Sequence, residues 1–173
     1  MYTNDYDYTR VNAIKIIVKN AEGKVLLIQE PATNDWMPLH WGLPGGKPTN
    51  RESLLETFER KCMSDLGSKL TLKGIFRTYE LLQEKRSVLM IIVVAEGNLT
   101  EIKGEIGNYK WVGLEDVTAM DITEFTEFYN KEMLIDLFTK AYDLVDFNSI
   151  RTLPFYSMSA DQEYTRWLES GKK

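Results

Sequence analysis

The chain has 173 residues, 43% of them hydrophobic and 12% aromatic, which is enough for one domain with a substantial core. Its formal net charge of −5 argues against a general nucleic-acid-binding protein, which needs a basic patch to replace counterions along phosphates. A single cysteine excludes an internal disulfide, and the sequence shows neither a membrane-spanning apolar run nor an N-terminal signal pattern. We therefore expect a cytoplasmic protein that binds neither nucleic acid nor membranes.

The first forty residues predict a lead-in, two strands and a loop. Residues 1–10 are polar and rich in tyrosine, without helical or strand periodicity. Residues 11–19 and 25–30 are β-branched and apolar, and the turn-forming residues between them predict a β-hairpin. The following loop carries Trp36 and the only histidine, His40. A lone histidine argues against a histidine metal cluster and against a Ser-His-Asp site.

The next segment joins a glycine-rich loop to a helix. Gly45 and Gly46 allow backbone conformations that are closed to other residues, and they let a ligand approach the main chain closely. Thr49 and Glu52 have the spacing of a capping box, so the helix is predicted to begin near residue 50 and to end at Gly67. One apolar stripe is predicted to face a sheet, and it consists of Leu55, Phe58, Cys62 and Leu66.

The remainder of the chain predicts more strands and further helices. The strands span residues 70–82, 87–96 and 109–112, with a buried central strand over residues 90–94. An acidic loop covers residues 97–107, and residues 114–117 are predicted to form a turn. Apolar residues at helical spacing predict a second long helix over residues 124–145, on the sheet face opposite the first helix, and a last helix is predicted over residues 159–170. This order predicts an α/β protein with a mixed sheet between helices.

The segment from Gly46 to Gly67 resembles the signature box of the Nudix hydrolases. That box runs Gly, five residues, Glu, seven residues, Arg-Glu, an aliphatic residue, any residue, Glu-Glu, any residue, Gly. Glu52, Arg60, Cys62 and Gly67 fall on matching positions, and residues 41–45 match the usual lead-in. At the positions of the three metal-binding glutamates, this chain carries Lys61, Ser64 and Asp65. The resemblance implies a Nudix-type α/β/α sandwich over residues 11–145, and we expect residues 146–173 to pack on the same domain.

The resemblance also implies a chemistry. Nudix hydrolases cleave nucleoside diphosphates linked to another moiety, using Mg²⁺ or Mn²⁺ ions that neutralise the phosphate oxygens and acidify the attacking water. In this chain the metal ligands would be Asp65 and, from a later loop, Glu105, while Glu52 and Arg60 would orient the glycine loop. Since two of the three metal-binding glutamates are replaced, the activity is predicted to be weak or lost.

Three local alternatives stay open at this point. Lys61 and Asp65 are four residues apart, which on a helix gives a surface ion pair, but the Lys61 ammonium could instead stand in for a metal and bind a diphosphate. Arg60 has the same spacing from Glu56 and could pair with it in place of Glu52. Glu105 could be one more solvated charge on an acidic loop.

The predicted ligand is a small nucleotide-like molecule. Its binding residues would be Gly45, Gly46, Lys61, Trp36 and Tyr79, with Trp36 as the stacking surface for a base. Three functions are compatible with this sequence. They are a weak Mg²⁺- or Mn²⁺-dependent hydrolase, a non-catalytic nucleotide-binding module without a cofactor, and a scaffold for protein interaction, including a homodimer.

Overall fold

The computed structural model describes residues 9–49, 51–82, 85–97, 99, 101–104 and 106–147. The predictions for the first eight residues, for Glu105 and for a helix over residues 159–170 lie outside these ranges. Within them, no helix has both the length and the apolar character that crossing a membrane requires.

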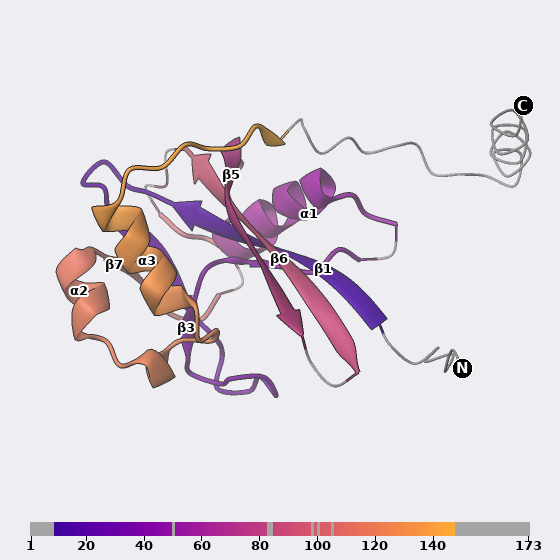
Figure 1. Ribbon diagram of the computed structural model, residues 1–173, viewed down its shortest axis with the longest axis horizontal. Helices are drawn as coiled ribbons and strands as arrows, with labels where there is room; N and C mark the ends of the chain where they lie inside the picture. Colours follow the sequence, from indigo (N-terminus) through magenta and orange to yellow (C-terminus); the bar gives the residue numbers. More distant parts are fainter. Residues whose placement is uncertain are drawn as a thin grey trace, which may run out of the picture.

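A four-stranded mixed sheet forms the centre of the molecule, in the order β4-β1-β6-β5. Its strands are β1 (Thr9–Val18), β4 (Gly45–Gly46), β5 (Thr71–Leu82) and β6 (Arg86–Glu96). Figure 1 shows β1, β6 and β5 side by side. The pair β1 and β6 is parallel, whereas β4 and β5 run antiparallel to their neighbours. Both faces of β6 are covered, and the predicted buried strand over residues 90–94 is confirmed.

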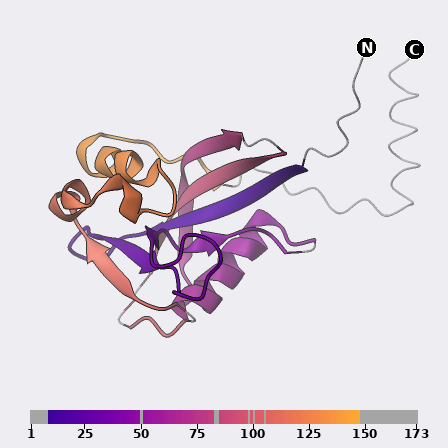
Figure 2. The same ribbon diagram turned by 90° about the horizontal axis from the view of Figure 1, so that it is seen from below.

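Two cores lie on opposite faces of this sheet, because successive residues of a strand point to opposite sides. One core contains Phe58 of α1 (Leu54–Lys61), and the other contains Met133 and Leu134 of α3 (Asn130–Thr139). Each of these fully buried side chains contributes about 1.5–3 kcal/mol through the hydrophobic effect. Figure 2 shows α1 and α3 on either side of the sheet, so the predicted α/β fold with a mixed sheet between helices is confirmed.

A second, antiparallel sheet has the order β3-β2-β7. It consists of β2 (Val25–Gln29), β3 (Trp41–Gly42) and β7 (Tyr109–Val112). The predicted hairpin of residues 11–19 and 25–30 is therefore wrong beyond its turn. Lys19 and Val25 form one antiparallel bridge, after which β1 and β2 enter different sheets. The reason is that β4 and β6 already occupy the two hydrogen-bonding edges of β1.

Helix α1 begins four residues later than the sequence predicted. Its N-cap is Ser53, whose hydroxyl accepts a hydrogen bond from the Glu56 amide at 3.2 Å, while the Glu56 carboxylate accepts one from the Ser53 amide at 2.7 Å. The Glu52 carboxylate does accept a hydrogen bond from the Thr49 amide at 2.9 Å, but this contact belongs to a turn before the helix. Two consecutive segments, residues 49–52 and 53–56, have the spacing of a capping box, and the second one is the helix start.

The apolar stripe of this helix is also shifted. Leu54 packs against the core, whereas Leu55 is 44% exposed, so the prediction for Leu55 is wrong. After α1 the chain continues as a π-helix, η1 (Cys62–Leu66), and Cys62 is buried in the core. The helix ends at Gly67, as predicted, with a left-handed φ of +67° that only glycine adopts at low cost.

The region after β7 differs most from the prediction. Residues 114–117 belong to a short helix, α2 (Leu114–Ala119), and the predicted long helix over residues 124–145 is reduced to α3, preceded by the 3₁₀ turn η2 (Ile122–Glu124). Phe125 forms a bridge with Trp41, and Val145 exchanges two backbone hydrogen bonds with Ile75 of β5 at 2.8 and 2.9 Å. These pairings with distant strands override the helical spacing of the apolar residues.

Candidate functional site

The glycine loop is fixed against the central strand β1. Gly45 and Gly46 pair with Lys15 and Ile14, respectively, in the short strand β4. The φ of Gly45 is +145°, and a Cβ atom there would lie 2.1 Å from the backbone oxygen of Ile14. The close approach of the two backbones is therefore possible only for glycine at this position. It places the Gly46 backbone at the edge of a cavity.

Glu52 and Arg60 tie the glycine loop to helix α1. The Arg60 guanidinium donates to both carboxylate oxygens of Glu52, from Nε to Oε1 at 2.7 Å and from Nη2 to Oε2 at 2.8 Å. It also donates to the backbone oxygen of Lys47 at 3.0 Å. The hydrogen bonds from Arg60 lower the pKa of Glu52 from 4.5 to about 2. Glu56, the alternative partner of Arg60, is used in the helix cap. The arrangement that the resemblance implies is thus the one that forms.

Lys61 and Asp65 form an ion pair that also contacts the glycine loop. The distance from Lys61 Nζ to Asp65 Oδ1 is 2.6 Å, and the two side chains are only 21% and 10% exposed. The Ser64 hydroxyl donates to Asp65 Oδ1 at 2.9 Å, and the Gly45 amide donates to Asp65 Oδ2 at 3.3 Å. The stem of Lys61 passes Gly46, where a Cβ atom would lie 3.1 Å from Lys61 Cε. The expected ion pair therefore exists, but it is largely buried and not a surface pair.

These side chains do not fit a divalent cation. Mg²⁺ prefers oxygen ligands. Here the carboxylate of Asp65 forms an ion pair with the Lys61 ammonium, whose positive charge repels a divalent cation. Across the described ranges, no group of three or more His, Cys, Asp and Glu side chains is placed to hold a metal ion. The other predicted ligand, Glu105, lies outside those ranges. Its neighbour Gly104 packs tightly on the backbone of Asp65, where a Cβ atom would lie 1.9 Å from the carbonyl oxygen.

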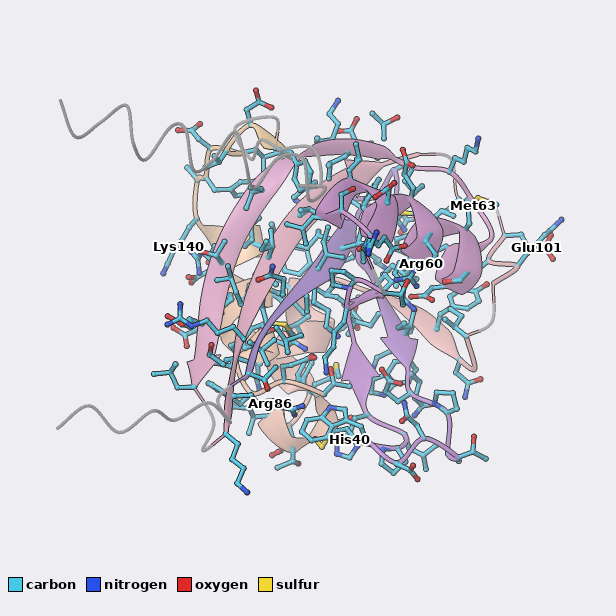
Figure 3. All side chains as sticks on the ribbon, turned by 90° about the vertical axis from the view of Figure 1, so that its right-hand side faces the viewer. His40, Arg60, Met63, Arg86, Glu101 and Lys140 are labelled. Atoms are coloured by element: carbon cyan, nitrogen blue, oxygen red, sulfur yellow. The ribbon has the colours of Figure 1, made fainter. Side chains whose placement is uncertain are left out.

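Two neighbouring cavities form a cleft beside Gly46, on the sheet face that α3 covers. The larger has a volume of about 700 Å³ and the smaller a volume of about 320 Å³. Trp36, Leu81 and Glu127 line both cavities, so they mark the boundary between them. Figure 3 labels His40, which lines the larger cavity, and Arg86, which lines the smaller one.

The predicted binding residues are distributed unevenly around this cleft. Trp36 lines both cavities, and Gly46 lines the smaller one. Lys61 is not among the residues that line either cavity; its side chain passes Gly46 and forms an ion pair with Asp65. Tyr79 lines neither cavity, because its ring packs against the core and stacks on Tyr129, with the ring centroids 4.3 Å apart. The structure thus brings Trp36 and the glycine loop together and separates Tyr79 from them.

A second ion pair, which sequence reasoning missed, lies at the boundary of the two cavities. Lys15 Nζ is 2.9 Å from Glu127 Oε1, and the side chains are 12% and 13% exposed. Glu127 also accepts hydrogen bonds from Thr126 Oγ1 and, at 2.8 Å, from Asn130 Nδ2. Burial opposes ionisation of Glu127, but the Lys15 ammonium and these hydrogen bonds lower its pKa below the ordinary value. One signal was available, since Lys15 interrupts the apolar run from Ala13 to Val18.

The comparisons with known proteins agree with this architecture. A family model, described as a NUDIX domain, matches residues 9–134. The solved MutT protein from Methanosarcina mazei Go1 is 21% identical with a TM-score of 0.64, and the match covers 74% of this chain and 92% of that chain. A NUDIX hydrolase from Nitrosomonas europaea is 11% identical with a TM-score of 0.68, and the match covers 84% of this chain and 98% of that chain.

A third similar structure is the NUDIX domain of Shewanella oneidensis NrtR in complex with ADP ribose. It is 20% identical with a TM-score of 0.55, and the match covers 69% of this chain and 83% of that chain. At these identities the structural likeness shows the fold alone. The family model, however, spans well over half of the sequence. This chain therefore belongs to the Nudix family.

Proposed function

We propose that this chain is a nucleotide-binding Nudix protein with a degenerate signature box, in which metal-dependent hydrolysis is weak or lost. The observation that carries the proposal is the buried ion pair of Lys61 and Asp65. It occupies the helix positions where the family has metal-binding carboxylates, and it does so with a cation. The non-catalytic nucleotide-binding module is thus favoured over the hydrolase.

The features that bind a nucleotide are kept. The bidentate contact of Arg60 with Glu52 holds the glycine loop in place, and the cleft beside Gly46 lies in the size range of small-molecule sites. Trp36 is more than half exposed at the rim of both cavities, where its ring is available for stacking on a base. The ADP ribose bound by the NrtR domain supports the same ligand class.

The features that drive hydrolysis are weakened. Attack of water on a diphosphate brings a nucleophile toward negative charge, so a hydrolase needs divalent cations to neutralise the phosphate oxygens and to acidify the water. Lys61 supplies one positive charge, and Asp65 neutralises it. Asp65 in turn is engaged with Lys61, Ser64 and the Gly45 amide. We therefore expect binding without efficient turnover.

A ligand panel tests this proposal. Binding and turnover are measured with ADP-ribose, nucleotide sugars, dinucleotides and nucleoside triphosphates, each in the presence of Mg²⁺ and of Mn²⁺. We expect at least one ligand to bind while turnover stays near the background rate. Fast, metal-saturable turnover would contradict the proposal. Absence of binding by every ligand would favour the interaction scaffold, and partner capture and a measurement of oligomeric state would follow.

A pair of variants sharpens the panel. The double change Lys61→Glu with Ser64→Glu restores two carboxylates to the helix, and we expect it to raise metal-dependent turnover above that of the parent protein. The matched control is Ser68→Glu with Lys69→Glu, which makes the same changes in residue type and charge just beyond Gly67. If turnover rises in the first variant and not in the second, the low turnover of the parent protein is due to Lys61 and Ser64.

A further inference from the structure

The two cavities of the cleft differ in charge. The smaller one, beside Gly46, is lined by three cationic residues and one carboxylate, which are Lys15, Lys47, Arg86 and Glu127. The described residues that line the larger cavity include no lysine or arginine, and the charged ones among them are Glu80 and Glu127. The smaller cavity therefore attracts anions such as phosphates, and the larger one does not.

The larger cavity has an apolar rim. Four large apolar side chains that line it are between 51% and 74% exposed, namely Trp36, Leu82, Ile122 and Phe128. Two of them are aromatic, and exposed aromatic side chains around a cavity bind flat apolar groups well. A ligand with phosphates beside Gly46 would thus place an aromatic moiety in the larger cavity.

The ion pair of Lys15 and Glu127 lies where the two cavities meet. Glu127 lines both cavities, and Lys15 lines the smaller one, on the strand position paired with Gly45. Thr126 and Asn130 also donate hydrogen bonds to Glu127, so its carboxylate is fixed in place. A carboxylate at this position acts on both ends of a ligand. It repels a nearby phosphate and partly neutralises Lys15, and it accepts hydrogen bonds from a group in the larger cavity.

We propose that Glu127 is a specificity-determining residue that selects diphosphates linked to an aromatic group with hydrogen-bond donors, and that it disfavours diphosphate alone. The inference rests on the proposed function, because it concerns the same cleft. The repulsion lowers the affinity for any diphosphate, and only a linked group that donates hydrogen bonds to the carboxylate offsets it, so the selectivity is a difference between two affinities. An adenine with its exocyclic amino group has the required chemistry, whereas inorganic pyrophosphate has only the anionic part.

The test compares ADP with inorganic pyrophosphate by titration calorimetry on the parent protein and on Glu127→Gln. We expect the parent to prefer ADP. In Glu127→Gln we expect pyrophosphate to bind about tenfold more tightly or better, because the repulsion is removed and Lys15 is no longer neutralised. ADP gains the same relief of repulsion but loses the carboxylate as a hydrogen-bond acceptor for its base, so the preference for ADP over pyrophosphate should shrink. The matched control is Glu80→Gln, a carboxylate of the larger cavity alone, which should leave the affinity for pyrophosphate unchanged.

A second variant guards against a folding defect, since Glu127→Gln leaves the buried Lys15 without its partner. Thermal unfolding is recorded for each variant. Lys15→Gln should have the opposite effect and weaken pyrophosphate binding, because Glu127 then faces the phosphates without its counterion. If Glu127→Gln does not fold, this variant decides, and unchanged pyrophosphate affinity overturns the inference.

The two proposals fail in distinguishable ways. If the parent binds neither ADP nor pyrophosphate, both the proposed nucleotide binding and the proposed role of Glu127 are overturned. If the parent binds ADP but Glu127→Gln keeps the same ratio of ADP to pyrophosphate affinity, only the role of Glu127 is overturned.

Discussion

The ammonium group of Lys61 lies 2.6 Å from one oxygen of Asp65, and the other oxygen of that carboxylate accepts a hydrogen bond from the Gly45 amide. Helix and glycine loop are thereby joined by protein groups. In a metal-dependent site, carboxylates of the helix would be held apart by mutual repulsion until a cation bound between them. Here the positive charge is part of the chain, so the loop is held in place without an added ion.

The first prediction concerns metal ions and stability. We expect the thermal unfolding temperature of the parent protein to be the same in Mg²⁺ and in EDTA, because no described group of carboxylates gains from binding a cation. The variant with Lys61→Glu and Ser64→Glu should be stabilised by Mg²⁺, by several degrees at saturating concentrations. Scanning calorimetry measures both. Loss of stability of the parent protein in EDTA would count against the account.

The second prediction concerns the buried ion pair itself. Lys61→Ala should lower the free energy of unfolding by about 2 kcal/mol, because it leaves the Asp65 carboxylate buried without a counterion. The double variant with Asp65→Ala should lose less than the sum of the two single changes, since the residues are in contact. Urea unfolding provides the values. Additive effects would show that the two charges do not interact.

The third prediction follows from the low pKa of Glu52. A carboxylate whose pKa is lowered on folding stabilises the protein above its unfolded pKa, and this stabilisation is lost as the pH falls. For Glu52 the loss should occur as the pH falls from 4.5 towards 2. Glu52→Gln and Arg60→Gln should each be less stable than the parent at neutral pH and should show a flatter pH dependence in that window. Thermal unfolding across the pH range measures the curves, and three parallel curves would contradict the prediction.

The fourth prediction concerns Trp36. This side chain is 58% exposed and lines both cavities, so Trp36→Ala should change the unfolding free energy little. It should weaken nucleotide binding about tenfold, in line with the energy of stacking a base on an aromatic ring. Inorganic pyrophosphate, which has no base, serves as the control ligand and should bind Trp36→Ala as it binds the parent. Equal losses for both ligands would assign Trp36 a structural role.

The sequence predicts the local features of this site but not the contacts between residues that are far apart in the chain. The glycine loop, the helix and its end at Gly67 follow from short-range patterns. The helix start does not, because two consecutive segments have the spacing of a capping box; the second one caps the helix, and Glu52 of the first one is bonded to Arg60. Lys15 and Glu127 come from opposite ends of the domain's sequence, so no local pattern predicts their ion pair.

The same limit explains the shortened helix α3. The spacing of apolar residues from Phe125 to Val145 is helical, but Phe125 pairs with Trp41 and Val145 pairs with Ile75. Backbone pairing with a strand satisfies hydrogen bonds that a helix would otherwise supply, and these partners are known only once the sheets are assembled. For the part that remains helical, periodicity predicted buried residues such as Leu134 and Leu137.

The most direct test of the account is the affinity for ADP-ribose, measured by titration calorimetry in Mg²⁺ and again in EDTA. We expect affinities that agree within about twofold, which corresponds to less than 1 kcal/mol, and turnover near the background rate in either buffer. Affinity that collapses in EDTA, or rapid turnover that saturates with Mg²⁺, would show that a bound metal ion takes part in binding or hydrolysis at this site.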